Sequence, residues 1–282
     1  MIKSGSRVVG FCGHAVTINA YGAGAEAMID FLCCDLPADS DARVQASYDL
    51  MCTGDEPMLS LWLEGTCIYS GNCKYDLAYA LINEIIYQCI VDNSAGQAIH
   101  AAAISSTAGA VLLPGKSGSG KSTLTTWLVS KGCNYLTDEL VLLGEGEQRL
   151  YPFTRPFSIK SGSAAVLSSL LKYAPSEILS GVNGFMLPHR LVNPHFSAVS
   201  PAFSLILFPK YEAGAPTSLI PLPSALGCAQ LMECYVNARN FQDHGIGQLA
   251  DFTRNTPAYQ LTYSSFTGLY ELLNDSFSEL FS

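Results

Sequence analysis

The sequence predicts an α/β protein with two domains, a smaller α+β domain over residues 1–96 and a larger α/β domain over residues 97–282. Of the 282 residues, 49% are hydrophobic and 14% are charged, which is enough apolar material for a substantial core. The first hundred residues consist of short apolar stretches broken by Gly, Asp and Pro, followed by a helical pattern. From residue 97 the predicted order is strand, glycine-rich loop, helix and strand, which is how many α/β folds begin.

The smaller domain is expected to contain a mixed sheet followed by one long helix. Its predicted strands cover residues 7–11, 16–20, 47–51, 59–64 and 66–70. Residues 74–92 then place apolar side chains at helical spacing, and residues 93–96 end this helix. The apolar face of the helix is formed by Leu77, Leu81, Ile82, Ile85, Ile86, Cys89 and Ile90.

The larger domain begins with two buried strands, over residues 98–104 and 110–113. A glycine-rich loop over residues 115–122 follows the second strand, and a helix over residues 122–131 follows the loop. The third strand, over residues 134–143, is interrupted by a Thr-Asp-Glu triplet. The remaining predicted elements are helices over residues 161–172, 224–237 and 266–281 and strands over residues 204–208 and 259–263.

Charge and composition exclude several classes of partner. The formal net charge is −9, whereas nucleic acids and anionic membranes are bound through surplus Lys and Arg, so neither is expected as a partner.

The first residues lack the apolar run of a signal peptide, and no run of about 18 apolar residues occurs, so a cytoplasmic location is expected. The ten cysteines are dispersed and form no C-x-x-C pair, which favours reduced thiols over disulfides or a zinc site.

The glycine-rich loop reads Gly-Lys-Ser-Gly-Ser-Gly-Lys-Ser and matches G-x-x-x-x-G-K-[ST] between a strand and a helix. Glycines let backbone N–H groups turn toward anionic oxygens, Lys121 neutralises the β and γ phosphates, and the Ser122 hydroxyl can ligate Mg²⁺. The loop therefore predicts binding of a nucleoside triphosphate, taken to be ATP, together with Mg²⁺. The residues expected to contact the nucleotide are Gly115, Lys116, Ser117, Gly118, Ser119, Gly120, Lys121, Ser122 and Thr123.

Two adjacent acidic residues indicate what kind of nucleotide protein this is. Asp138 and Glu139 come 16 and 17 positions after Ser122, closer than the Asp-Glu pair of an ABC-type ATPase, and the guanine-binding Asn-Lys-x-Asp of GTPases is absent from the sequence. Phosphoryl transfer to a hydroxyl needs a carboxylate that accepts the proton and a group that holds Mg²⁺. The two acids suit these roles, and a solvated strand end is the alternative reading.

His100 lies 22 positions before Ser122, on the strand preceding the one that leads into the loop. A histidine among Ala and Ile residues is often a core residue, and that reading stays open from the residues alone.

Together these features resemble the catalytic domain of HPr kinase/phosphorylase, a P-loop serine kinase whose core is similar to phosphoenolpyruvate carboxykinase. That family has a His upstream of the loop, a G-x-S-G-x-G-K-S loop, and a Gly-x-x-hydrophobic-x-Asp-Asp segment after the helix. Here they correspond to His100, residues 115–122, and Gly132 through Glu139. The resemblance implies an α/β P-loop kinase core of this type with a smaller α+β N-terminal domain.

The resemblance also implies a role for each matching residue. His100 would support the transferred phosphate, Lys121 its charge, and Ser122 the Mg²⁺ ion. Glu139 would accept the proton, and Asp138 would be the adjacent metal or water ligand.

One family feature is missing, and another region points to a subgroup of the family. The Mg²⁺-binding Glu of a Glu-hydrophobic-Arg-Gly segment has no match at residues 151–161, so the reverse, phosphorolytic activity is not implied. Arg155, in Arg-Pro-Phe, is expected to reach a phosphate, with a surface or structural Arg as the alternative. The segments His-Ala-Ala-Ala, Thr-Asp-Glu and Arg-Pro-Phe are more similar to divergent HPr-kinase-related kinases, which include lasso-peptide precursor kinases.

The resemblance thus implies a kinase that transfers the γ phosphate of ATP to a Ser hydroxyl of a small protein or ribosomal peptide precursor. An ATP-sensing regulatory module without efficient transfer, and a small-molecule kinase, remain as alternatives. The sequence does not identify the acceptor, and a homo-oligomer is compatible with it.

Overall fold

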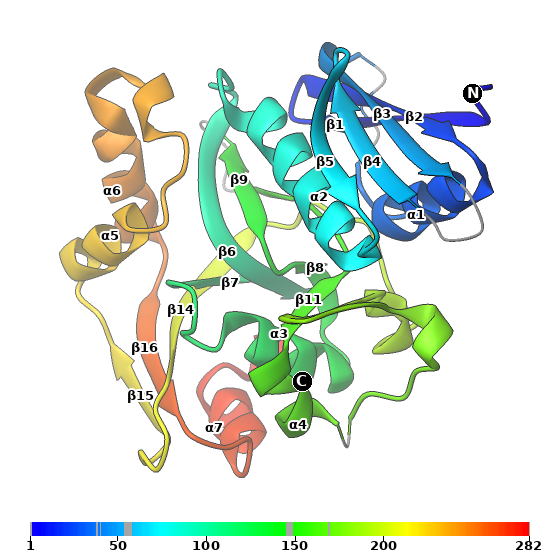
Figure 1. Cartoon of the computed structure of the whole chain (residues 1–282). Coiled ribbons are helices and arrows are strands. Elements are labelled where there is room, and N and C mark those ends of the chain that lie inside the picture. Colours follow the sequence, from blue (N-terminus) through cyan, green and yellow to red (C-terminus); the bar gives the residue numbers. More distant parts are fainter. Residues whose placement is uncertain are drawn as a thin grey trace. The chain divides into compact units, whose positions relative to one another are not determined.

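The computed structural model describes residues 2–37, 39, 41–53, 58–144, 149–168 and 170–281. The chain forms two compact units, whose elements are labelled in Figure 1. The first unit contains Met1–Asn93, Thr154–Val166 and Lys172–Pro188, and the second contains Ser94–Phe153, Leu167–Leu171 and His189–Ser282. Two segments that the sequence predicts to lie in the second domain therefore belong to the first unit.

The first unit is built on a five-stranded mixed sheet with the order β1-β2-β3-β4-β5. All five predicted strands are present, and β2 and β3 pair in parallel while the other neighbours are antiparallel. The strands are β1 (Gly5–Phe11), β2 (His14–Tyr21), β3 (Arg43–Thr53), β4 (Met58–Leu63) and β5 (Thr66–Gly71).

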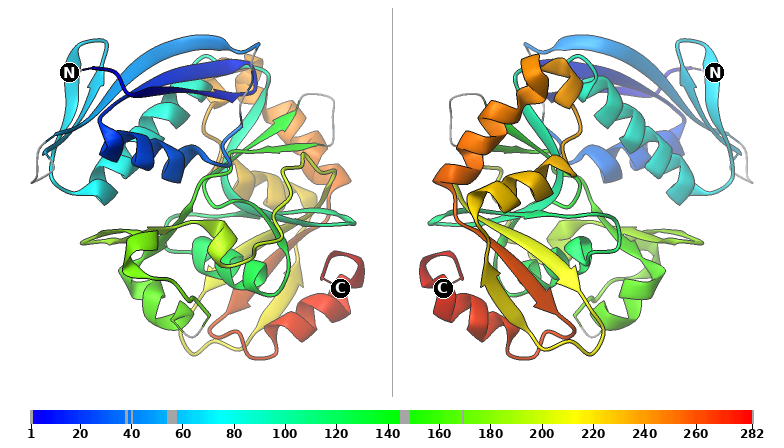
Figure 2. Two further views of the ribbon diagram at one scale, coloured as in Figure 1. Left: turned by 90° about the vertical axis from the view of Figure 1, so that its right-hand side faces the viewer. Right: turned by 90° about the vertical axis from the view of Figure 1, so that its left-hand side faces the viewer.

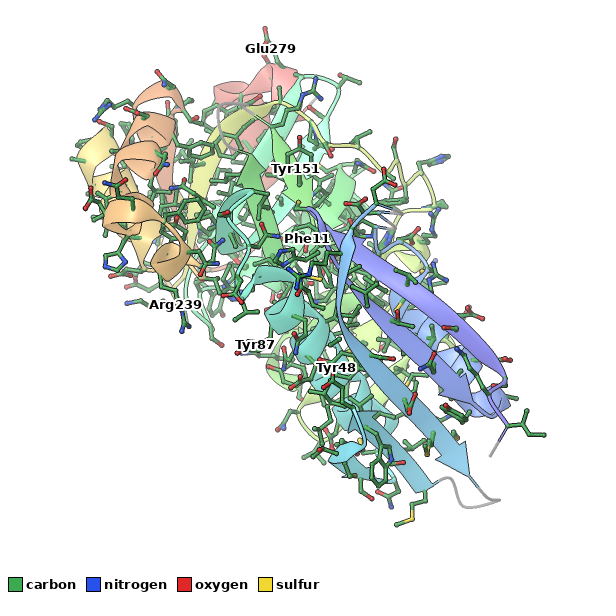
Figure 3. The ribbon with its side chains drawn as sticks, turned by 90° about the horizontal axis from the view of Figure 1, so that it is seen from above. Phe11, Tyr48, Tyr87, Tyr151, Arg239 and Glu279 are labelled. Carbon is green, nitrogen blue, oxygen red and sulfur yellow. The ribbon has the colours of Figure 1, made fainter. Side chains whose placement is uncertain are left out.

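Two helices pack on this sheet. The predicted long helix is α2 (Lys74–Ile90). Tyr48 of β3, labelled in Figure 3, donates a hydrogen bond to Glu84 of α2 at 3.0 Å. Helix α1 (Ala23–Cys33) was not predicted. Its buried side chains, which follow a helical spacing, are Ala25, Met28, Ile29, Leu32 and Cys33. The pattern was therefore present, but two glycines at its start and small residues weakened it.

A second, three-stranded sheet also belongs to the first unit. It has the order β11-β13-β12, formed by β11 (Phe157–Lys160), β12 (Leu179–Gly181) and β13 (Gly184–Leu187). Helix α4 (Ser161–Leu167) follows β11. The helix predicted over residues 161–172 therefore ends at Leu167, earlier than expected.

The second unit is built on an eight-stranded mixed sheet with the order β10-β9-β6-β7-β14-β16-β15, in which β8 also pairs with β6. Strands β7, β14 and β16 are parallel to one another, and β6 is antiparallel to β7, β8 and β9. The strands are β6 (Gly96–Ser106), β7 (Gly109–Pro114), β8 (Asn134–Thr137), β9 (Leu140–Gly144), β10 (Leu150–Pro152), β14 (Phe203–Tyr211), β15 (Ser218–Pro221) and β16 (Ala258–Tyr263).

The helices of this unit are α3 (Lys121–Ser130), α5 (Ser224–Met232), α6 (Ile246–Asn255), α7 (Leu269–Ser276) and α8 (Ser278–Phe281). Helix α3 follows β7, as predicted. The helix predicted over residues 224–237 ends at Met232, and the predicted closing helix is divided into α7 and α8 at Phe277. Helix α6 was not predicted, because its apolar stripe covers only ten residues, of which Leu249 and Thr253 are buried.

The core of the second unit lies where α5 and α6, which pack against each other, cover the sheet (Figure 2). The shared cluster contains Ile99, Ala101 and Ala103 of β6 together with Leu231 of α5 and Leu249 of α6. Small alanines at alternate positions of β6 let side chains from the helices approach the sheet closely. The structure is thus a mixed α/β fold, in agreement with the predicted class.

Two further expectations concern the whole chain. Within the described ranges, no helix combines the length and the apolar character needed to cross a membrane. All ten cysteines are free thiols. Five of them are buried, namely Cys33, Cys89, Cys133, Cys228 and Cys234.

Candidate phosphate-binding site

The carboxyl ends of β7, β14 and β16 lie at one edge of the second unit's sheet, because these strands are parallel. The loop of residues 115–120 connects the end of β7 to the start of α3 at this edge. Ligands of open α/β sheets bind at the carboxyl ends of parallel strands. The predicted loop therefore lies at the sheet edge where a ligand of such a fold binds.

The backbone of the loop needs glycine at two positions. Gly118 has φ +90° and Gly120 has φ +95°, a left-handed conformation that side chains with a Cβ rarely adopt. A Cβ on Gly120 would also clash with the hydroxyl of Tyr263. These two glycines therefore let the backbone take the turns that a phosphate loop requires.

The neighbouring strands anchor the loop. The backbone N–H of Tyr211, at the end of β14, donates to the Ser119 carbonyl at 3.0 Å. The hydroxyl of Tyr263, at the end of β16, donates to the Gly120 carbonyl at 3.1 Å. Burial raises the pKa of Tyr263, with a smaller contribution from Tyr211, so this hydroxyl stays a neutral donor at physiological pH.

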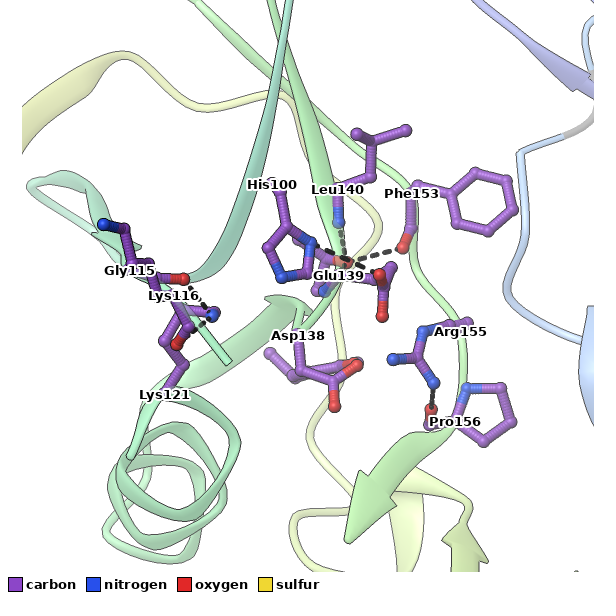
Figure 4. Close-up of polar contacts among 12 residues, drawn as sticks. His100, Gly115, Lys116, Lys121, Asp138, Glu139, Leu140, Phe153, Arg155 and Pro156 are labelled. Carbon is purple, nitrogen blue, oxygen red and sulfur yellow. Dashed lines mark hydrogen bonds and ion pairs between the residues drawn. The ribbon is translucent and has the colours of Figure 1, made fainter. Parts of the chain in front are cut away.

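The first turn of α3 presents positive charge toward the loop. Among the described residues, no side chain caps this helix, whose N-cap is Gly120. The N–H groups of an uncapped first turn and the helix dipole favour an anion. Lys121 is 6% exposed, and its ammonium group donates to the carbonyl oxygens of Gly115 and Lys116 (Figure 4). The lysine is thus held against the loop, where a phosphate could replace the carbonyls as its partner.

The loop and the first turn of α3 also carry hydroxyl groups, on Ser119, Ser122 and Thr123. Ser119 Oγ is buried and has no hydrogen-bond partner among the residues that the structure describes. A buried hydroxyl without a partner is costly, so this atom suits a ligand oxygen. Ser122 and Thr123, in the first turn of α3, are both partly exposed. Loop, lysine and hydroxyls therefore fit a triphosphate.

The two acids occupy a break between β8 and β9. Both strands pair with β6, since Thr137 lies opposite Ala103 and Leu140 lies opposite His100. The predicted strand interrupted by the Thr-Asp-Glu triplet is therefore confirmed. On its other side, β6 places Ala101 opposite Pro114, the residue before the loop. Two strand spacings, about 10 Å, thus separate the backbone at the acids from the start of the loop.

Thr137 fixes the turn that carries the acids. Its hydroxyl donates to the Phe153 carbonyl at 2.7 Å and accepts from the N–H groups of Glu139 at 3.1 Å and Leu140 at 3.4 Å. The side chain is fully buried. Sequence reasoning treated Thr137 only as part of the interruption, although a Thr before two acids is a signal for a turn closed by its own hydroxyl.

His100 and Glu139 form a pair at this edge. His100 Nδ1 lies 3.3 Å from Glu139 Oε1, and the two side chains are 37% and 25% exposed (Figure 4). The histidine is therefore not enclosed in the core. The contact orients the carboxylate, and the exposure leaves the pair accessible to a substrate.

Asp138 is in a different environment. It is 2% exposed, and Tyr135 donates a hydrogen bond from its hydroxyl to Asp138 Oδ1 at 3.2 Å. A buried carboxylate next to a phosphate loop is a suitable ligand for Mg²⁺, which usually takes one or two carboxylates and completes its shell with phosphate oxygens and water. Within the described part of the chain, no three His, Cys, Asp or Glu side chains gather as a metal cage, and Mg²⁺ with a nucleotide does not require one.

A segment that sequence reasoning missed flanks the loop on its β6 side. The backbone N–H of His100 donates a hydrogen bond to the Cys234 carbonyl at 2.8 Å. The backbone N–H of Val236 donates one to the Ala98 carbonyl at 2.8 Å. Glu233 in the same segment forms an ion pair with Lys116 of the loop at 3.0 Å. The segment is more than 110 residues away from the loop in sequence, and no local pattern indicates this contact.

The structure thus gathers His100, the loop residues 115–123, Asp138 and Glu139 in one unit. Their individual roles stay predictions. Arg155 belongs to the first unit, where it is buried and donates to the Pro156 carbonyl at 3.3 Å. Its contact with a phosphate stays a prediction too.

No family model matches this chain, and no curated protein is found to be similar to it. Among solved structures, it is similar to the Hpr(Ser) kinase/phosphatase from Coxiella burnetii, with 14% sequence identity and a TM-score of 0.33. The match covers 64% of this chain and 96% of the other. A likeness this distant carries no weight for function, which has to be inferred from the site itself.

Proposed function

We propose that this chain is an ATP-dependent phosphotransferase that transfers the γ phosphate of ATP to a Ser hydroxyl of a small protein or peptide. The observation that carries the proposal is the His100–Glu139 pair, at 3.3 Å, on the sheet edge where the phosphate loop begins. A loop for phosphates explains binding alone. An accessible, oriented carboxylate beside it also supplies a base for an attacking hydroxyl.

The proposed binding roles follow from the contacts described above. Lys121 would exchange the Gly115 and Lys116 carbonyls for phosphate oxygens, and the backbone of residues 115–120 would enclose them. Ser122 and Asp138 would hold Mg²⁺. When bound, Mg²⁺ would neutralise negative charge on the phosphate oxygens.

The proposed role of Glu139 is to take the proton of the acceptor. The acceptor oxygen forms a bond to the γ phosphorus, the bond from that phosphorus to the bridging oxygen breaks, and ADP leaves with the bond's electrons. The acceptor proton passes to the Glu139 carboxylate. His100 would orient this carboxylate through the 3.3 Å contact.

The Ser acceptor is proposed from the resemblance of the loop, the histidine and the acids to HPr-kinase-related kinases. The acidic chain, with a net charge of −9, gives no general attraction to another anionic molecule. Recognition of the acceptor would therefore depend on local contacts. The proposal includes a cytoplasmic location and permits a homo-oligomer.

The test is single-turnover transfer from γ-labelled ATP to Ser-containing peptides encoded next to the gene, with detection of a mass gain of one phosphate. Glu139→Gln keeps the size of the side chain but removes the base. We expect transfer to fall by roughly 10²- to 10⁴-fold while ATP affinity persists. Glu271→Gln, exposed in the first turn of α7, is the matched control and should transfer at the parent rate.

Each other outcome selects an alternative. If Glu139→Gln transfers as fast as the parent, Glu139 is not the base, and Asp138 becomes the candidate. If the parent binds ATP but phosphorylates no protein, peptide or small hydroxyl compound, the chain is an ATP sensor. If only a small hydroxyl compound is phosphorylated, the protein acceptor is wrong and the chain is a small-molecule kinase.

A further inference from the structure

We propose that the Tyr211 ring, at the carboxyl end of β14, is the surface on which the nucleobase stacks. The inference rests on the proposed function, because it assumes that a nucleoside triphosphate occupies the phosphate loop. It adds a base subsite, on the opposite side of the loop from the acids, that accepts a purine base by stacking.

Tyr211 lies directly against the loop. Its backbone N–H donates to the Ser119 carbonyl at 3.0 Å. A Cβ built on Gly120 would lie 3.2 Å from the Cβ of Tyr211. The side chain of Tyr211 therefore begins within contact distance of the residue that opens α3.

The ring is both positioned and accessible. It makes an edge-on contact with the Tyr263 ring, with centroids 5.8 Å apart and planes at 70°. Tyr263 is buried and bonded to the loop through its hydroxyl, so it fixes the Tyr211 ring relative to the loop. Tyr211 is nevertheless 49% exposed. An aromatic ring that is held in place but half exposed is suited to stacking, because little side-chain entropy remains to be lost.

The order of the strands sets the direction of the bound nucleotide. The loop follows β7, which lies between β6 on one side and β14 on the other (Figure 1). The acids and His100 lie on the β6 side, so the transferred phosphate must point there. The nucleoside, at the other end of the triphosphate chain, must therefore extend toward the β14 side, where Tyr211 lies.

Other aromatic residues of this region are unsuitable. Trp127 of α3 is buried and stacked on Phe266 with centroids 4.6 Å apart, so both rings already have partners. Among the large hydrophobic side chains found exposed in the described residues, Tyr211 is the one at the carboxyl end of a parallel strand. Stacking on a Tyr ring tolerates any base, so this subsite would add affinity without strong selection between adenine and guanine.

The test separates the base from the phosphates. Calorimetric titrations compare Mg²⁺-ATP, Mg²⁺-GTP and inorganic tripolyphosphate with Mg²⁺, on the parent and on Tyr211→Ala. Loss of one base-stacking contact should weaken ATP and GTP binding by about 5- to 100-fold. Tripolyphosphate binding should be unchanged. Tyr211→Phe should bind ATP as the parent does. Tyr87→Ala, in the first unit with a ring 55% exposed, is the matched surface control and should have no effect.

The outcomes distinguish the two proposals. If the parent binds neither ATP nor tripolyphosphate, the proposed function is wrong, and the base subsite with it. If the parent binds ATP and Tyr211→Ala binds it equally well, the function stands and the base subsite is refuted. If Tyr211→Ala loses tripolyphosphate as strongly as ATP, Tyr211 supports the loop instead of a base, and the inference is refuted.

Discussion

Replacing Thr137 with Val removes one buried hydroxyl from the turn that carries Asp138 and Glu139. The shape is nearly kept, but the Phe153 carbonyl loses its donor and the N–H groups of Glu139 and Leu140 lose their acceptor. Each hydrogen bond lost in this way costs about 0.5–1.5 kcal/mol net. Two of the three distances lie in the usual hydrogen-bond range and the third is long, so we expect a loss of about 2–3 kcal/mol in the free energy of unfolding.

The same change should affect catalysis more than binding, because the turn positions Glu139 and not the phosphate loop. Transfer at saturating ATP should fall by roughly 10- to 100-fold. Denaturant unfolding, followed by Trp127 fluorescence in a Trp62→Phe background, reports the second unit alone, since Trp62 lies in β4 of the first unit. Thr137→Ser keeps the hydroxyl and should lose only about 1 kcal/mol. A loss below about 0.5 kcal/mol for Thr137→Val, with unchanged transfer, would refute the reasoning.

Three more predictions concern the loop and the buried thiols. Lys121→Ala should lower the rate of ATP turnover by about 10²-fold or more. It should also abolish the rise in melting temperature that Mg²⁺-ATP gives the parent protein, and a parent-like rise would contradict the proposed site. Gly120→Ala, at φ +95° and against Tyr263, should lower the melting temperature and prevent nucleotide binding, as a thermal scan with and without ATP can show. Burial raises the pKa of the Cys33 and Cys89 thiols to about 12, against 9.0 when exposed. The unfolded chain therefore ionises first, and stability should fall between about pH 9 and 12. A Cys33→Ala, Cys89→Ala variant should show a shallower fall in denaturant titrations at pH 8 and 10, and an unchanged slope would count against this cause.

The sequence predicted the elements whose signal is local. Residues 115–122 match a strict motif whose glycines, lysine and serine each have a physical task, and the structure places this loop between β7 and α3. The strand broken by the Thr-Asp-Glu triplet is likewise present as β8 and β9. Helix α2 was predicted correctly because its apolar residues recur at helical spacing over several turns.

Long-range contacts account for most of what the sequence could not predict. Tyr211 and Glu233 touch the loop through strand pairing and chain reversals far along the chain, and no local pattern specifies those contacts. The association of residues 154–166 and 172–188 with the first unit also depends on tertiary packing. Helix α6 shows a third cause: Ile246, Leu249 and Ala250 recur at helical spacing, but the pattern spans only the ten residues Ile246–Asn255 and is too short to stand out from the polar residues between them.

The anchoring of the loop by Tyr211 and Tyr263 has a thermodynamic consequence for the first encounter with nucleotide. Because the Ser119 and Gly120 carbonyls are already bonded to neighbouring strands, the backbone of the loop is ordered before a ligand arrives. The entropic cost of ordering the loop, about 1–2 kcal/mol for each residue fixed, is then incurred during folding and does not weaken nucleotide binding. For the triphosphate, what remains on binding is the exchange of Lys121's two carbonyl partners for phosphate oxygens. Stacking of the base on the Tyr211 ring would add apolar burial, and with it a negative change in heat capacity that tripolyphosphate does not give.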